Sequence, residues 1–167
     1  MARRGVLGLA LFATAAVCAC SDATSSAPHA AFGTRLRVWT PDSAAILANE
    51  AISGLQSATQ IVVDDSLSWH ALWQAIYARH LPPPPAPLID FTSHSVLVYG
   101  LGSLYASLRF DSITYYDLGT VAYLTDTRPG SNCIVPAVVL TPVIAVIAPE
   151  RVAVRAWLLR DVVHQCS

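Results

Sequence analysis

The sequence contains no lysine, so all ten of its basic residues are arginines. Charged residues make up only 13% of the chain, and beyond Arg3 and Arg4 the arginines form neither a run nor a cluster. A nucleic-acid partner is therefore not expected, because binding to a phosphate backbone requires a basic patch. The absence of lysine itself carries no argument about function.

Long hydrophobic runs are also lacking beyond the N-terminus, although apolar residues make up 54% of the chain. A membrane-spanning helix needs about 18–20 consecutive apolar residues. Pro136, Pro142 and Pro149 interrupt the longest stretch that could approach this length. At 167 residues the chain has the length of one domain with a core of ordinary size.

The signatures of common catalytic and metal sites are missing as well. There is no G-x-S-x-G motif, since the glycines of Gly100-Leu101-Gly102-Ser103 both precede the serine. His70 and His80 are ten residues apart, which places them on different faces of a helix, and His94 and His164 stand alone. We therefore expect a protein that is not an enzyme, with no catalytic residue, no cofactor and no metal site.

The first 19 residues have the organisation of an export signal. Met1–Gly5 is short and basic, and Val6–Val17 is an apolar run too short to span a membrane. The sequence Val17-Cys18-Ala19-Cys20 resembles a bacterial lipobox. The resemblance implies that residues 1–19 are a lipoprotein signal peptide and that Cys20 carries a lipid anchor in the cell envelope, in the outer membrane if the source has one. The alternative is an ordinary secretory signal, with Cys20 incidental.

A flexible tether is predicted for residues 20–34, because Ser21–Phe32 is small, polar and without periodicity. Fully extended, its roughly twelve residues would reach about 40 Å. After removal of residues 1–19, eight arginines would oppose eleven acidic residues, a net charge near −3. Residues 35–167 are predicted to form a single domain.

The clearest helix follows Asp64-Asp65-Ser66, which offers several N-cap side chains. Large apolar side chains recur there at helical spacing, and we expect this face to pack on a sheet; the alternative is a ligand groove. Leu81 precedes four prolines, so the helix must end there, and Pro82–Pro87 is predicted to run as an extended connector. The face consists of Trp69, Leu72, Trp73, Ile76, Tyr77 and His80.

The rest of the domain is predicted to be β, and only residues 44–52 are ambiguous, since their alanines also favour a helix. The pattern predicts an α+β fold that is mostly β, with an antiparallel sheet or sandwich of about six or more strands and one Trp-rich helix packed on it. Asp117-Leu118-Gly119 supplies a turn. The β-like runs are residues 36–39, 44–52, 60–63, 95–100, 104–115, 120–127, 134–140, 143–147 and 151–158.

Two cysteines remain for the mature domain, Cys133 and Cys166. If Cys18 is removed with the signal peptide and Cys20 is acylated, these two are expected to form a disulfide in an exported protein. The bond would close a loop of about 34 residues and stabilise the fold by about 3–4 kcal/mol in the chain-entropy model.

Several short motifs occur in an order that resembles the PrcB family of protease-complex subunits. The resemblance covers about residues 54–166, and the order and spacing of the motifs carry it. The motifs are Trp69-x-x-Leu72-Trp73, the proline stretch leading to Ile89-Asp90-Phe91, the strand Val96–Gly102, Pro129-Gly130-x-x-Cys133, Leu140-Thr141-Pro142-Val143 and the terminal cysteine.

The resemblance implies a non-catalytic accessory lipoprotein that assists or binds an exported protease or another envelope protein. The chain departs from the family at Gly102-Ser103-Leu104-Tyr105, which keeps only the tyrosine of a Gly-Gly-Tyr, and at Val135-Pro136-Ala137, which replaces a polar Thr-Gln-Ala. The alternative is an envelope-structural or small-ligand-binding lipoprotein without a protease partner. The expected partner-binding loops, chosen because loops often carry function, contain Gly102, Ser103, Tyr105, Pro129, Gly130, Ser131 and Asn132.

Overall fold

The computed structural model describes residues 32–102, 107–135 and 138–166. The signal peptide, the lipobox with Cys20 and the tether up to residue 31 lie outside the described residues, as do Ser103 and Tyr105. The elements are β1 (Arg35–Trp39), β2 (Ile46–Glu50), β3 (Ala58–Val63), α1 (Ser66–Ile76), β4 (Val96–Leu101), β5 (Ser107–Tyr116), β6 (Gly119–Pro129), β7 (Val143–Ile147) and β8 (Val154–His164).

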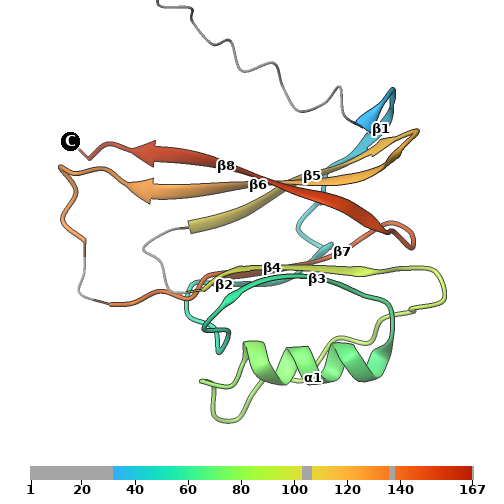
Figure 1. Ribbon diagram of the computed structural model, residues 1–167. Helices are drawn as coiled ribbons and strands as arrows, with labels where there is room; N and C mark the ends of the chain where they lie inside the picture. The colour runs from blue at the N-terminus through green and yellow to red at the C-terminus, as the bar shows by residue number, and fades with distance from the viewer. Residues whose placement is uncertain (1–31, 103–106, 136–137, 167) are drawn as a thin grey trace, which may run out of the picture.

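The elements are stacked in three layers (Figure 1). Sheet A has the strand order β1-β5-β6-β8, and sheet B has the order β2-β7-β4-β3. The two sheets face each other, and α1 lies on the other face of sheet B. The predicted fold class is confirmed: the chain is mostly β, with a two-sheet sandwich and one Trp-rich helix packed on it.

One strand pair departs from the antiparallel pattern, because β8 lies parallel to β6. After β6 the chain crosses to sheet B, forms β7 and only then returns to sheet A as β8. An antiparallel neighbour could follow β6 through a short hairpin, as β6 itself follows β5, whereas a parallel neighbour needs a long crossover. The crossover here is the connection through β7.

The position of β4 in the fold accounts for the apolar run SVLVYG, which forms most of this strand. It is a central strand of sheet B, covered by sheet A on one face and by α1 on the other. Leu97 and Tyr99 belong to the core between the sheets, while Val96 and Val98 belong to the core beneath the helix. A strand buried on both faces reads as a continuous hydrophobic run rather than as an alternation.

The apolar face of α1 packs on sheet B as predicted. Trp69 and Trp73 are only 1% and 3% exposed, and Ile76 is fully buried. At the start of α1 the Asp65 carboxylate caps the helix by accepting a hydrogen bond of 2.8 Å from the Ser68 amide, which lowers the pKa of Asp65. At the other end the helix stops at Ile76.

The end of α1 lies five residues before the predicted limit at Leu81, so His80 is not part of the helix. The Ile76 carbonyl, which the amide of residue 80 would need in a longer helix, accepts a hydrogen bond of 2.9 Å from the Gly54 amide. The His80 amide instead bonds the Tyr77 carbonyl at 2.9 Å. A contact with a distant segment therefore ends the helix before the prolines do.

The proline stretch runs back beside the tryptophans of α1. The Trp73 indole N–H donates to the Pro84 carbonyl at 2.8 Å, and the Trp69 indole N–H donates to the Pro87 carbonyl at 3.0 Å. Both indole rings are thus buried and both N–H groups are bonded. This arrangement removes the alternative in which the aromatic stripe is an open ligand groove.

Tyr77 gives the sandwich a sensitivity to alkaline pH. Burial, and then the hydrogen bond of 2.9 Å to Glu50 and its charge, raise the pKa of Tyr77 from 10.0 to about 12. Because the folded state favours the protonated phenol, this contribution to stability is complete below about pH 10 and is lost as the pH rises toward about 12. Between about pH 10 and about pH 12, we expect the Tm of Tyr77→Phe to fall less steeply with pH than the Tm of the wild type. Equal slopes of Tm against pH in the two proteins would show that Tyr77 does not cause this pH dependence.

Candidate binding surface at the disulfide end of the sandwich

The two loops predicted to bind a partner leave the sandwich at the same end, on the left in Figure 1. Ser107, the first residue of β5, lies opposite Thr127 near the end of β6. The Leu101 amide, at the end of β4, donates to the Pro142 carbonyl at 3.0 Å. The structure therefore brings Gly102 and the segment 129–132 to one end of the molecule.

The predicted disulfide between Cys133 and Cys166 is confirmed, with a Cα–Cα distance of 5.1 Å. A turn precedes it, closed by a hydrogen bond of 3.0 Å from the Cys133 amide to the Gly130 carbonyl. The Asn132 side chain brackets the Cys166 backbone, since its Nδ2 donates to the Cys166 carbonyl and its Oδ1 accepts from the Cys166 amide at 3.3 Å. Asn132, predicted as a partner-binding residue, thus also fastens the C-terminal strand.

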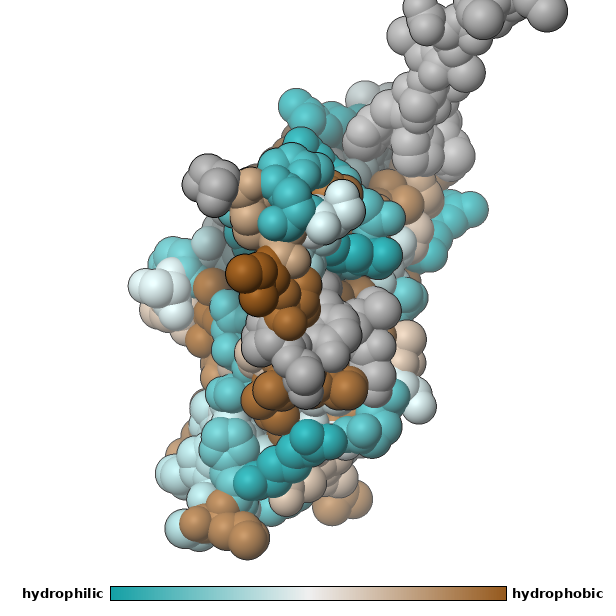
Figure 2. Space-filling view, turned by 90° about the vertical axis from the view of Figure 1, so that its left-hand side faces the viewer, coloured by the Kyte–Doolittle hydropathy of each residue, from teal (hydrophilic) through white to brown (hydrophobic). Residues whose placement is uncertain are grey.

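Beyond the disulfide, the chain presents apolar side chains to solvent. We call residues 133–140 the apolar loop; positions 136 and 137 lie outside the described residues. Ile134 is 100% exposed, and Val135, Val138 and Val139 are 39%, 47% and 55% exposed. Figure 2 looks onto this end and shows two brown, hydrophobic areas near the middle of the view, beside the grey atoms. Exposed apolar side chains gathered in one place mark interaction sites more often than isolated ones do.

The β-branched composition of the apolar loop favours a strand, but none of its described residues lies in one. A strand is stable only when a neighbour satisfies its backbone groups. Here the chain passes from sheet A to sheet B across the end of the sandwich, and its first strand residue in sheet B is Val143.

The far end of the apolar loop is fixed by a buried clamp between Thr141 and Ser53, both of which are fully buried. The Thr141 hydroxyl donates to the Ser53 carbonyl at 2.6 Å and accepts from the Ser53 amide at 2.7 Å. The Ser53 hydroxyl donates to the Thr141 carbonyl at 2.7 Å. Ser53 and Thr141 are 88 residues apart, and nothing in the sequence around either of them indicates that they are partners. The apolar loop is therefore held at both ends, by the disulfide and by this clamp.

An acid, a serine and a histidine also occur close together beside β4, at Asp64, Ser95 and His94. The Ser95 hydroxyl donates to Asp64 and accepts a hydrogen bond of 3.1 Å from the Val152 amide. The His94 Nδ1 bonds the Ala148 carbonyl at 2.9 Å. These bonds hold the connection between β7 and β8. In the described part of the chain, no group of three or more His, Cys, Asp or Glu is placed to hold a metal ion.

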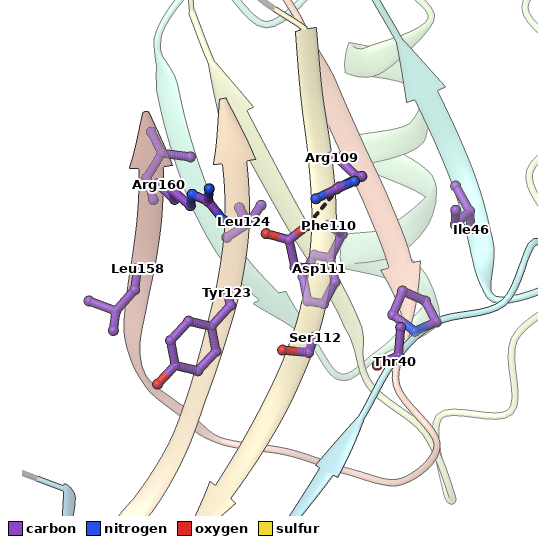
Figure 3. A pocket seen from close by; sticks show the side chains of 12 residues that line it. Thr40, Ile46, Arg109, Phe110, Asp111, Ser112, Tyr123, Leu124, Leu158 and Arg160 are labelled. Carbon is purple, nitrogen blue, oxygen red and sulfur yellow. Dashed lines mark hydrogen bonds and ion pairs between the residues drawn. The ribbon is translucent and has the colours of Figure 1, made fainter. Parts of the chain in front are cut away.

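A cleft of about 830 Å³, which the sequence did not reveal, lies beside sheet A (Figure 3). Arg109 pairs with Asp111 at 2.7 Å, and the other carboxylate oxygen of Asp111 accepts from the Thr125 hydroxyl at 2.6 Å. Tyr123, Leu158 and Arg160 line the same cleft. Its walls combine charged and apolar groups.

The fold and site define the chain as a two-sheet β sandwich with a helix on one outer face and an apolar loop at one end. Comparisons of the chain with protein-family models, with curated proteins and with solved structures find no match. The resemblance to the PrcB family remains a prediction from the order of short motifs. Among the described residues no helix is long and apolar enough to cross a membrane.

Proposed function

We propose that the protein is a lipid-anchored, non-catalytic accessory module of the bacterial cell envelope that binds a partner protein through the apolar loop. An exported protease is the class of partner that the PrcB resemblance implies. The observation that carries the proposal is the apolar loop itself, which is exposed at Ile134, Val138 and Val139 and held at both ends.

Holding both ends of the loop favours binding. Fully burying one Val or Ile side chain contributes about 1.5–3 kcal/mol. Association must overcome the loss of rigid-body freedom and the cost of ordering loops at the interface. The Cys133–Cys166 bond and the Thr141–Ser53 clamp order the ends of the loop before any partner arrives. The binding energy of the exposed side chains is then available for association.

The tether joins the domain at the end opposite the apolar loop. The first strand residue, Arg35, lies opposite Tyr116, and the Thr34 amide bonds the Asp117 side chain at 2.9 Å in the β5–β6 turn. That turn and the apolar loop lie at opposite ends of β6 (Figure 1). Eleven strand residues span about 35 Å. A lipid on Cys20 would thus be joined, through the tether, to the end of the domain that is remote from the apolar loop.

The alternative is a lipoprotein that binds a small ligand, and the cleft beside sheet A favours it. A volume of about 830 Å³ lies within the range typical of ligand pockets. Arg109, Asp111 and Arg160 would orient a polar ligand, and Tyr123 and Leu158 would cover its apolar part.

The test is affinity capture of the mature protein from its own cells, with mass spectrometry of bait and prey. We expect an acylated Cys20 peptide and a stoichiometric exported protease. The double variant I134S/V139S should lower capture by at least about tenfold, because the apolar contact is lost, while its Tm stays close to that of the wild type. Leu67→Ser and Leu88→Ser are matched controls, since both leucines are highly exposed and lie outside the loop.

Each part of the proposal can fail separately. An unmodified Cys20 would refute the lipid anchor. Equal capture by the wild type and by I134S/V139S would refute the role of the apolar loop. An acylated bait without any protein partner would favour the small-ligand alternative and would move attention to the cleft beside sheet A.

A further inference from the structure

We propose that the cleft beside sheet A binds a small organic acid, with its acidic group between two arginines and its apolar part on a tyrosine and a leucine. The arginines are Arg109 on β5 and Arg160 on β8, and the apolar side chains are Tyr123 on β6 and Leu158 on β8 (Figure 3). The proposal rests on the small-ligand alternative and gives it a chemical class of ligand. It does not involve the apolar loop, so each proposal can fail without the other.

The side chains that would hold the ligand share the outer face of sheet A. Leu124 of β6 belongs to the core between the sheets, and Leu159 of β8 packs against that core. Successive side chains of a strand point to opposite faces. Tyr123, Leu158 and Arg160 therefore point away from the core, into the cleft that they line.

Two neighbouring rows of this face carry the two kinds of group. In one row Thr125 is paired in register with Arg109 on one side and with Arg160 on the other. In the next row Leu158 lies opposite Tyr123. Side chains two residues apart on one strand are about 7 Å apart. An acid whose apolar group lies about that far from its carboxylate would contact both rows.

A β-bulge in β5 holds one of the arginines in place. The pairing of β5 with β6 shifts by one residue between Phe110 and Ser112, which makes Asp111 the bulged residue. Bulges re-aim a side chain out of the regular alternation. The Asp111 carboxylate accepts from the Arg109 Nε at 2.7 Å and from the Thr125 hydroxyl at 2.6 Å. The other N–H groups of the Arg109 guanidinium stay available for a ligand.

The charges of the cleft favour an anion. Asp111 offsets the charge of Arg109, whereas Arg160 is exposed and takes part in none of the ion pairs among the described residues. Its neighbour Asp161 has its ion-pair contact with Arg128, at 3.5 Å. Guanidinium groups form strong, charge-assisted hydrogen bonds with carboxylates. A carboxylate between the two arginines would therefore compensate the charge of Arg160, and a cation would be repelled.

The apolar part of the site is prepared for a ring or an alkyl chain. Tyr123 and Leu158 are both half-buried beside the cleft. The hydroxyl oxygens of Tyr123 and Tyr116 lie 2.9 Å apart and share a hydrogen bond, which holds the Tyr123 ring in place. A side chain that is already ordered costs less entropy when a ligand binds. The site therefore fits an aryl or alkyl carboxylic acid better than it fits a simple inorganic anion.

Labelling of arginines with butanedione in the full chain, followed residue by residue by mass spectrometry, tests the proposal with 4-phenylbutyrate as the probe. We expect the probe to slow the modification of Arg109 and Arg160 at least about fivefold, with half-protection at about 1 mM. Arg79 is exposed and lies outside the cleft, so its modification rate should not change. The amine 4-phenylbutylamine, with the opposite charge, and inorganic phosphate, without an apolar part, should both protect at least about tenfold more weakly.

Two substitutions assign the two parts of the ligand. Leu158→Ser should raise the half-protection concentration at both arginines about tenfold, because the apolar contact is lost. Arg160→Gln should raise it about tenfold at Arg109, because one of the two cations is lost. Thermal unfolding checks that both variants keep the stability of the wild type, which we expect because neither side chain belongs to the buried core.

The outcomes separate this site from the apolar loop. The double variant I134S/V139S should bind the probe as the wild type does, and weaker protection in it would place the probe on the apolar loop and overturn the proposal. Equal protection by the acid and the amine would overturn it as well, as would equal protection by phosphate. Protection of Arg79 to the same degree as Arg160, or unchanged protection in L158S and R160Q, would show that the probe does not occupy the cleft.

Discussion

Replacing Gly54 by alanine is expected to lower the free energy of unfolding by about 3 kcal/mol, since it combines overpacking with the loss of a backbone hydrogen bond. A Cβ atom at Gly54 would lie 2.1 Å from the Ala75 carbonyl oxygen and 2.9 Å from the Ala78 Cβ. The close approach is needed because the Gly54 amide bonds the Ile76 carbonyl at 2.9 Å. Moving the segment away to fit a methyl group would break that bond.

Thermal and denaturant unfolding of Gly54→Ala measure this cost, and for a domain of this size we expect a fall in Tm of about 10 °C. Gly100→Ala is the matched control. A Cβ at Gly100 would meet its nearest atoms, Thr59 Cβ and Leu55 Cδ1, at 3.6 and 3.7 Å, which is ordinary contact. A G54A protein as stable as G100A would show that the end of α1 does not need this close approach.

The sequence predicts best those elements whose burial follows a simple period. The helical spacing of Trp69, Trp73 and Ile76 predicted a face that packs on a sheet, and all three are buried there. The run SVLVYG predicted a buried strand, and β4 is buried on both faces. Local periodicity reports what a helix or strand packs against, because its side chains carry the pattern themselves.

Features that depend on contacts between segments far apart in the sequence could not be predicted from the local residue pattern. The helix end at Ile76 is set by Gly54, and the parallel placement of β8 is set by a crossover through the other sheet. The clamp at the end of the apolar loop joins Ser53 and Thr141, which are 88 residues apart. Nothing in the residues around either position indicates the other.

The candidate site was predicted in part. The disulfide between Cys133 and Cys166 was predicted, and the structure contains it. The composition of residues 134–140 predicts a strand, because valine and isoleucine favour strands wherever a neighbour exists. Whether a neighbour exists is a property of the whole fold. The cleft beside sheet A involves β5, β6 and β8 and has no local signature.

Removing the disulfide with Cys133→Ser and Cys166→Ser is expected to lower the free energy of unfolding by about 3–4 kcal/mol in the chain-entropy model. The two cysteines are 33 positions apart, so the reduced chain regains the freedom of a long loop that also includes β7 and β8. Denaturant titration measures this loss. The wild type in a strong reductant should match the double variant, and a difference of less than about 1 kcal/mol between oxidised and reduced protein would contradict the prediction.

The disulfide should affect binding as well as stability, and the two effects can be separated. A domain stabilised by about 5–15 kcal/mol survives a loss of about 3–4 kcal/mol, so the double serine variant is expected to stay folded at moderate temperature. It then retains the Thr141–Ser53 clamp but loses the covalent attachment at the other end of the apolar loop. Partner capture should fall more than the folded fraction does, because the loop must now be ordered on binding. Capture that falls only in proportion to the folded fraction would mean that the disulfide stabilises the sandwich without preparing the apolar loop for its partner.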